Sequence, residues 1–207
     1  MKTIVYTLTH IAAFIAGVIA LPVVLLITVK VAPDAIPNLA KALISRTASK
    51  AHGTAALMTA KTEEERFYYL GAAAKEEFNK GHISDAKNYA TELATLAPKY
   101  TKNWNYGNAI QDANLVLGRI AVRDGNIEAA KSYLSEEAKS PGSPQMDSFG
   151  PNVSLAKDLL EKKETEAVIN YFTACKTFWK MHNGKLDDWI ASVKAGNIPD
   201  FGANLVY

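Results

Sequence analysis

Apolar residues recur at intervals of three and four along much of the chain, which is the spacing of one face of an α-helix. The first such face consists of Phe67, Leu70, Ala74 and Phe78. A turn at Gly81 follows, the same period resumes over residues 83–97, and Pro98 then ends the run because proline cannot continue a helix. The pattern predicts two antiparallel amphipathic helices joined by a short glycine turn.

The chain repeats this hairpin 44 residues downstream, where GNIEAAKSYLSEEA (125–138) matches GHISDAKNYATELA (81–94) at seven of fourteen positions. The apolar face before the second turn consists of Ile110, Ala113, Leu117 and Ile120. A weaker third pair of helices is predicted between about 153 and 179. The capping helix predicted after it has an apolar face formed by Leu186, Trp189, Ile190 and Val193. We therefore predict an all-α solenoid of about three helical hairpins plus a capping helix.

Two further segments, residues 140–152 and the C-terminal tail, bear on the predicted fold. Residues 140–152 contain three prolines and two glycines, so this segment is predicted to be non-helical. It is either a recognition loop or, as we expect, an ordered linker in which Met146 and Phe149 pack onto the core. The tail at 198–207 is too apolar to be left in water, so we expect it to dock on the body or on a partner. Its docking residues would be Phe201, Leu205, Val206 and Tyr207.

The second hairpin resembles a tetratricopeptide repeat, through the spacing of its small and apolar residues. These residues are Leu117, Gly118, Ala121, Gly125, Ala130 and Leu134. The first hairpin departs from the pattern at Ala73 and Ala74, which stand where the family has leucine and glycine. The family repeat is about 34 residues long, so the segment at 98–107 must add a loop or lengthen a helix. The resemblance covers roughly residues 64–180.

The resemblance implies a concave groove that is lined by the first helix of each hairpin and holds a peptide or protein partner. In this chain the groove positions are Tyr68, Lys75, Phe78, Asn79, Asp112, Leu115, Arg119 and Arg123. A basic strip able to hold a carboxylate or an acidic peptide would consist of Lys75, Asn79, Arg119 and Arg123. The alternative is that these are solvated side chains with partners one helical turn away, and the sequence favours neither reading.

The first 30 residues are predicted to form a transmembrane anchor. Between Lys2 and Lys30 lie 27 residues without a formal charge, and a helix of about 20 residues crosses a bilayer core. A cleaved signal peptide is the alternative, although its apolar region is usually only about 7–15 residues long. The face that would contact another membrane helix consists of His10, Ala13, Gly17 and Ala20.

The predicted domains are the anchor at 1–30, a helical linker at 31–62 and the repeat domain at 63–207. Basic residues that follow the span favour a cytoplasmic repeat domain, although a bacterial signal-anchor would place it on the periplasmic side. The chain has 23 Lys and Arg residues against 21 Asp and Glu. Two of the basic residues flank the span, so the rest of the chain is neutral and nucleic acid is not an expected partner.

No motif in the sequence indicates an enzyme or a metal site. Cys175 is the only cysteine and lies in an apolar run, which predicts a buried core residue. His82 is explained as a polar residue at a helix start. Glu76 and Glu77 point about 100° apart on a helix, so we do not expect them to converge on one cation. We expect no catalytic residue, no metal, no cofactor and no small-molecule substrate.

The expected function is therefore binding. In the first hypothesis the chain is a single-pass membrane protein whose repeat domain acts as a scaffold or assembly factor and holds a protein partner beside the membrane. In the second, it is a constitutive accessory subunit of a larger membrane complex and is held there by its span. In the third, it is a periplasmic or secreted enzyme with an unrecognised site, whose activity would depend on His82 or Glu76.

Overall fold

The computed structural model describes residues 53–206, and every regular element in that part of the chain is helical. The predicted all-α fold is confirmed for these residues. None of their helices combines the length and the apolar character that crossing a bilayer requires. The predicted anchor at 1–30 lies outside the described residues, as do the first part of the linker and the proposed membrane interface of His10, Ala13, Gly17 and Ala20.

Within the described part, the α-helices are α2 (Gly53–Thr59), α3 (Glu63–Lys80), α4 (Ile83–Leu96), α5 (Tyr106–Arg123), α6 (Ile127–Glu137), α7 (Pro144–Phe149), α8 (Ser154–Glu161), α9 (Thr165–Cys175) and α10 (Lys185–Lys194). Two short 3₁₀ helices are also present, η2 (Ala97–Tyr100) and η3 (Gly202–Leu205). Each long helix covers an apolar periodic segment of the sequence.

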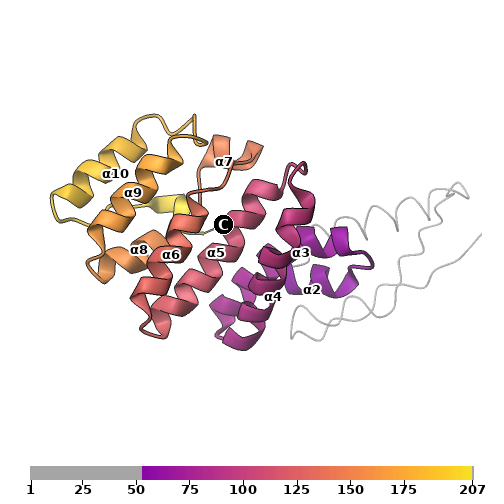
Figure 1. The fold of residues 1–207 in the computed structure, drawn as a ribbon. Coiled ribbons are helices and arrows are strands. Elements are labelled where there is room, and N and C mark those ends of the chain that lie inside the picture. The colour runs from indigo at the N-terminus through magenta and orange to yellow at the C-terminus, as the bar shows by residue number, and fades with distance from the viewer. Residues whose placement is uncertain (1–52, 207) are drawn as a thin grey trace, which may run out of the picture. The chain divides into compact units, whose positions relative to one another are not determined.

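Consecutive helices pair into three hairpins, α3 with α4, α5 with α6 and α8 with α9, which follow one another in chain order (Figure 1). Each hairpin contacts the next, because α3 and α4 pack on α5, and α5 and α6 pack on α8. At the two ends, α2 packs on α3 and α10 packs on α9. The first helices of successive hairpins are therefore neighbours.

Local sequence explains where α3 begins and ends. Thr62 accepts a hydrogen bond from the Glu65 backbone N–H, while the Glu65 carboxylate accepts one from the Thr62 N–H. Gly81 ends the helix with a φ of 83°, and Gly125 takes the same left-handed conformation, with a φ of 77°, in the second turn. A residue with a Cβ is strained there, which explains why both copies have glycine.

Small residues let neighbouring helices approach closely. Ala86 on α4 and Ala130 on α6 occupy equivalent positions in the two copies, and neither has exposed surface. Gly118 on α5 faces Leu155 on α8, and a Cβ at this glycine would lie 2.2 Å from Leu155 Cδ2. The two equivalent alanines are thus buried, and the glycine of the second copy packs against the third hairpin.

The prediction that residues 140–152 are non-helical is wrong in part, because α7 lies within them. Ser143 accepts a hydrogen bond from the Met146 N–H and so caps α7. Pro144 is tolerated in the first turn, where its missing N–H would have no partner within the helix. Met146 is buried as expected, but Phe149 is 66% exposed.

The helix α2 belongs to the same packed body as the hairpins. Ala56 and Leu57 are buried, and Leu57 joins the core formed by α3, α4 and α5. Gly53 approaches the backbone of α3 so closely that a Cβ would lie 2.3 Å from the Ala72 carbonyl carbon. Helical packing therefore begins before residue 63, where the sequence predicted the start of the repeat domain.

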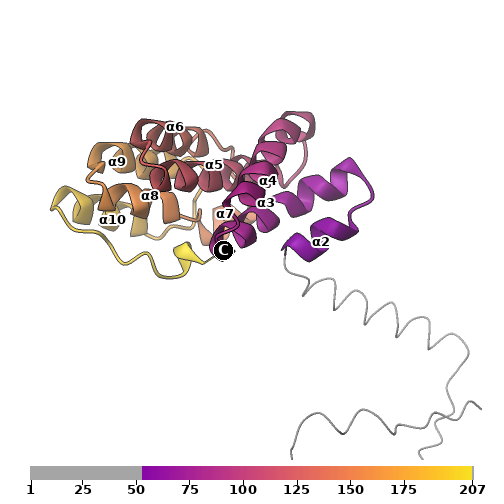
Figure 2. The same ribbon diagram turned by 90° about the horizontal axis from the view of Figure 1, so that it is seen from below.

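The C-terminal tail runs from α10 back to the middle of the stack (Figure 2). Phe201 is buried, and its ring contacts the rings of Phe172 and Trp189. The predicted docking of the tail is therefore found at Phe201 and at Leu205, which is half-buried and packs against the same core. Val206, by contrast, is 80% exposed, and Tyr207 lies outside the described residues.

Candidate functional site

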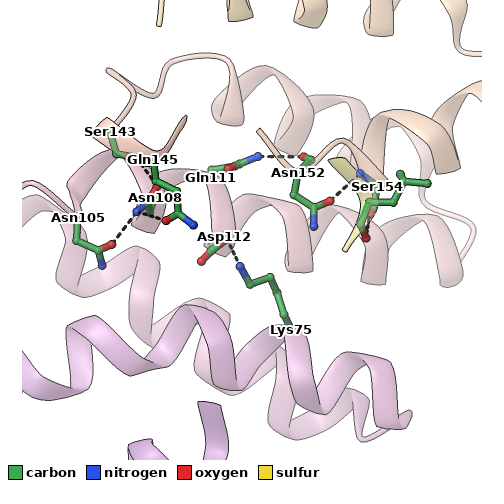
Figure 3. Close-up of polar contacts among 10 residues, drawn as sticks. Lys75, Asn105, Asn108, Gln111, Asp112, Ser143, Gln145, Asn152 and Ser154 are labelled. Carbon is green, nitrogen blue, oxygen red and sulfur yellow. Dashed lines mark hydrogen bonds and ion pairs between the residues drawn. The ribbon is translucent and has the colours of Figure 1, made fainter. Parts of the chain in front are cut away.

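A cleft of about 640 Å³ lies between α3 and α5. The α7 segment, defined as residues 144–153, and the C-terminal tail close it on a third side. Its main lining residues are Phe67, Tyr68, Lys75, Phe78 and Asn79 from α3; Asn105, Asn108, Gln111, Asp112, Leu115 and Arg119 from α5 and its N-cap; and Gln145, Met146, Asn152, Ser154 and Leu205 from the third side. Figure 3 shows several of the polar side chains of this cleft, together with the neighbouring Ser143.

Seven of the eight residues predicted to line a groove do line this cleft: Tyr68, Lys75, Phe78, Asn79, Asp112, Leu115 and Arg119. Arg123, in the last turn of α5, is exposed and does not line it. These positions come from the resemblance to tetratricopeptide repeats, which implies a groove lined by the first helix of each hairpin. The role of these residues in binding a partner stays a prediction.

An ion pair joins α3 to α5 inside the cleft (Figure 3). Lys75 Nζ lies 2.7 Å from Asp112 Oδ1, and the two side chains are only 26% and 17% exposed. Gly71 leaves room for the same carboxylate, since a Cβ there would lie 2.4 Å from Asp112 Oδ2. The Lys75 ammonium is therefore already engaged by a carboxylate of the cleft.

Arg119 is paired as well. Its Nε donates to Asp158 Oδ2 on α8 at 2.7 Å, and its guanidinium lies 4.6 Å from the centre of the Phe78 ring. The carboxylate partners of Lys75 and Arg119 lie on neighbouring helices and not one turn away on the same helix. Each charged residue that lines the cleft has an oppositely charged partner, so the predicted basic strip offers little free positive charge.

Amide side chains other than Asn79, which the groove prediction omitted, supply much of the remaining polar lining (Figure 3). Asn108 Nδ2 donates to Asn105 Oδ1 at 2.9 Å, and Asn108 Oδ1 accepts from the Ser143 hydroxyl at 2.6 Å. Gln111 is buried and donates to the Asn152 carbonyl at 2.9 Å. Residues 105, 108 and 111 recur every three positions, and this spacing is the sequence signal that could have identified them.

Hydrogen bonds fix the third side of the cleft. Asn152 Oδ1 accepts from the Ser154 N–H at 2.9 Å, and the Ser154 hydroxyl donates to the Leu205 carbonyl at 3.3 Å. The Val153 N–H donates to the Asn204 carbonyl at 2.8 Å. With the bond from α5 to the Asn152 carbonyl, these contacts connect α5 to the C-terminal tail.

A second polar cluster lies at the turn between α3 and α4, and it corrects one expectation. Glu76 and Glu77 both contact the Lys80 ammonium, at 2.7 and 2.9 Å. The prediction that these adjacent carboxylates do not converge on one cation is therefore wrong. Lys80 lies four and three positions further along the helix, within reach of both side chains.

Glu77 is the buried centre of this cluster. The Lys80 ammonium, the His82 ring and the Thr54 hydroxyl together lower the pKa of the Glu77 carboxyl to about 2. His82 precedes α4 but makes no capping hydrogen bond, and its Nδ1 lies 2.6 Å from Glu77. Glu77, His82 and Asp85 are close enough to hold a metal ion, but Glu77 is engaged by its other partners. We interpret the cluster as a brace that fastens α2 to the end of α3.

Cys175 is buried, as its apolar surroundings predict, and burial raises the pKa of its thiol. A protonated and inaccessible thiol is a poor nucleophile. Beside it, the Tyr171 hydroxyl donates to Glu137 Oε2 at 3.2 Å. None of these three side chains lines the cleft.

Comparison of the chain with models of protein families, with curated proteins and with solved structures finds no match. What the chain does must therefore be inferred from its own residues. The cleft between α3 and α5 is the site that these residues define most clearly.

Proposed function

We propose that the chain is a protein-interaction scaffold that binds an extended peptide segment of a partner in the cleft between α3 and α5. The observation that carries the proposal is the composition of this cleft, in which paired charges and a row of amides lie among aromatic and aliphatic side chains. The resemblance to tetratricopeptide repeats supports the same function. In that family the groove lies on the first helices of the hairpins, and the corresponding helices here border the cleft.

Amide side chains suit a polypeptide backbone as ligand. A carboxamide both donates and accepts hydrogen bonds, as a peptide unit does, so Asn and Gln can bond a segment that has no secondary structure of its own. The side chain of Asn79 is exposed at the cleft and makes no hydrogen bond with any described residue. The cleft volume of about 640 Å³ lies within the usual range for ligand sites, about 300–1,000 Å³.

We place this scaffold at a membrane. The support comes from the sequence, because the 27 uncharged residues between Lys2 and Lys30 are enough for one helical span. A single-pass anchor would hold the cleft beside the bilayer and raise the effective concentration of partners that are bound there too. No catalytic role is part of the proposal.

A cleft-filling substitution tests the site. Ala72 is an exposed residue of α3 that lines the cleft and lies close to Gly53 of α2, so Ala72→Trp fills part of the cleft, and urea unfolding checks that the contact with α2 survives. Ala94→Trp, at an exposed position of α4 that does not line the cleft, is the matched control. Peptides are selected from a random dodecapeptide display library on the full-length chain in mild detergent. We expect Ala72→Trp to weaken binding of the enriched peptides at least tenfold, or about 1.4 kcal/mol, and Ala94→Trp to leave it unchanged.

Failure to enrich any peptide, or equal binding of the enriched peptides by the two tryptophan variants, would show that the cleft is not the binding site. Affinity purification with mass spectrometry then separates the scaffold from the accessory subunit. A partner recovered both by the full chain and by a chain lacking residues 1–30 supports the scaffold. Loss of every partner without residues 1–30 would favour a subunit held through its span.

A further inference from the structure

We infer that the cleft takes an uncharged segment in polyproline II conformation, with a proline ring stacked on Trp104. This inference rests on the proposed function and narrows its ligand. Three features carry it: an exposed tryptophan whose ring stacks on a lining residue of the cleft, the place of that tryptophan in the repeat, and the pairing of the charges that line the cleft.

Trp104 is 59% exposed, whereas Trp179 and Trp189 are 2% and 6% exposed. Its ring stacks on that of Tyr68, with the centroids 6.0 Å apart and the planes at 28°. Tyr68 lines the cleft, and its hydroxyl accepts a hydrogen bond from Asn103 Nδ2 at 2.6 Å. The indole is thus supported on one side while much of its surface is open to a ligand.

The position of Trp104 in the repeat points the same way. The two hairpin turns are 44 residues apart, whereas the repeat that the chain resembles has about 34, and Trp104 lies in the extra segment at 98–107. Tyr100 of this segment stacks on Phe67 of α3, with centroids 4.5 Å apart, which anchors the segment over the cleft helix. Trp104 belongs to none of the buried hydrophobic clusters, and we interpret its open face as a surface for the ligand.

The paired charges select against a charged ligand. Lys75 and Arg119 are held by carboxylates, and Glu76 is held by the Lys80 ammonium. A charged ligand side chain would have to break one of these pairs or lose its hydration without gaining a partner. An uncharged segment therefore replaces the acidic peptide that the basic strip predicted.

A polyproline II segment meets these conditions. Its backbone has no internal hydrogen bonds, so its carbonyl groups can accept from the exposed side-chain amide of Asn79. The indole N–H of Trp104 is another donor, and it bonds none of the described residues. A proline ring presents a rigid apolar face to the indole, and the preformed segment loses little entropy on binding.

The test uses the peptides selected on the full-length chain, with acrylamide quenching of tryptophan emission as a second readout. Quenching reports on Trp104 because the other two tryptophans are buried. We expect the enriched peptides to be rich in proline, poor in charged residues, and able to protect Trp104 from acrylamide. We expect Trp104→Ala to weaken their binding at least tenfold and Trp104→Phe, which keeps an aromatic face, to weaken it less. Tyr69→Ala, at an exposed position of α3 that does not line the cleft, is the control.

Enriched peptides that lack proline or share charged positions, and that Ala72→Trp still blocks, would overturn this inference and leave the proposed function intact. Proline-rich peptides that bind Trp104→Ala as well as the unmodified chain would do the same. If no peptide is enriched, both the inference and the proposed function fail. They also fail if chitohexaose, a neutral oligosaccharide, protects Trp104 when no peptide does.

Discussion

Glu137, in the second hairpin, occupies a position where the first hairpin has a leucine. At the offset of 44 residues it corresponds to Leu93, and both residues are 1% exposed. Glu137 Oε2 accepts the hydrogen bond from Tyr171, while Oε1 has no hydrogen-bond partner among the described residues. Burial, and after it the Asp112 carboxylate, raises the pKa of Glu137 well above its ordinary value, although the Tyr171 hydroxyl opposes the shift. The folded protein therefore favours the protonated, neutral form of this side chain.

This carboxyl group should make the protein less stable as pH rises. Below the ordinary pKa of 4.5 both the folded and the unfolded chain bind the proton, so ionisation of this group costs no stability there. Above it the unfolded chain releases the proton first, and the free energy of unfolding falls until the folded-state pKa is passed. Glu137→Gln removes this titration. We expect it to be more stable than the unmodified chain at about pH 8, by about 1–3 kcal/mol, and the difference to shrink near pH 5, as measured by urea unfolding.

The adjacent Glu136 provides the control for this experiment. Its side chain is 47% exposed and pairs with Lys139, a surface contact worth about 0–1 kcal/mol. Glu136→Gln should therefore shift stability little and leave its pH dependence unchanged. If the Glu137→Gln profile ran parallel to that of the unmodified chain, Glu137 would not be the titrating group.

At the residue scale, the sequence predicts positions but not partners. The resemblance to tetratricopeptide repeats places Lys75 and Arg119 among the expected groove positions. Their partners Asp112 and Asp158 lie 37 and 39 residues away, and helical spacing does not select them from the 21 acidic residues of the chain. The charge state of the cleft, and with it the class of ligand, therefore depends on packing between helices.

At the scale of elements, Gly118 sets how closely α5 approaches α8. A Cβ at this position would lie 2.2 Å from Leu155 Cδ2 and 3.1 Å from Tyr133 Cβ. Leu155 is fully buried, so it has little room to move away. In Gly118→Ala we expect overpacking to lower the free energy of unfolding by about 1–3 kcal/mol. The higher helix propensity of alanine offsets about 1 kcal/mol of this loss. Urea unfolding measures the net change.

A double-mutant cycle identifies the cause of that change. In a Leu155→Ala background the new methyl group meets empty space, so Gly118→Ala should be neutral or stabilising by up to about 1 kcal/mol. The same loss in both backgrounds would contradict the proposed contact between α5 and α8. It would place the obstacle elsewhere, for example at Tyr133.

Helix ends can be predicted where one residue type enforces them. Gly81 and Gly125 have the positive φ that their turns require, and the sequence shows both. The helix α7 escapes prediction because three prolines indicate a break, while Pro144 in fact occupies a first-turn position, where proline is tolerated. The place of α2 in the core depends on its contact with α3, which the period of its own seven residues does not reveal.

At the scale of the whole molecule, the C-terminal tail joins segments that are far apart in the sequence. Asn204 is 3% exposed, and its Nδ2 donates to the carbonyls of Phe149 and Pro151, both at 3.0 Å. Its own carbonyl accepts from the Val153 N–H. The apolar composition of the tail predicts that it docks. It does not predict where, because Asn204 binds backbone groups, which every sequence has.

Asn204→Ala should therefore loosen the third side of the cleft. The substitution removes a donor from two carbonyl groups, and we expect it to lower the free energy of unfolding by about 1–3 kcal/mol. Amide hydrogen exchange at residues 144–153 should become faster, because these residues lose a contact that holds them. Asn197→Ala, at an exposed position after α10, is the matched control and should leave exchange in that segment unchanged.

The same variant tests whether the tail supports peptide binding in the cleft or only stabilises the fold. The α7 segment brings Gln145, Met146 and Asn152 to the cleft, so faster exchange there should be accompanied by weaker binding of the selected peptides. Because stability and binding would then depend on one set of hydrogen bonds, bound peptide should in turn slow exchange at 144–153 in the unmodified chain. Faster exchange in Asn204→Ala with unchanged peptide affinity would contradict this coupling, and α3 and α5 would then form the binding site without the tail.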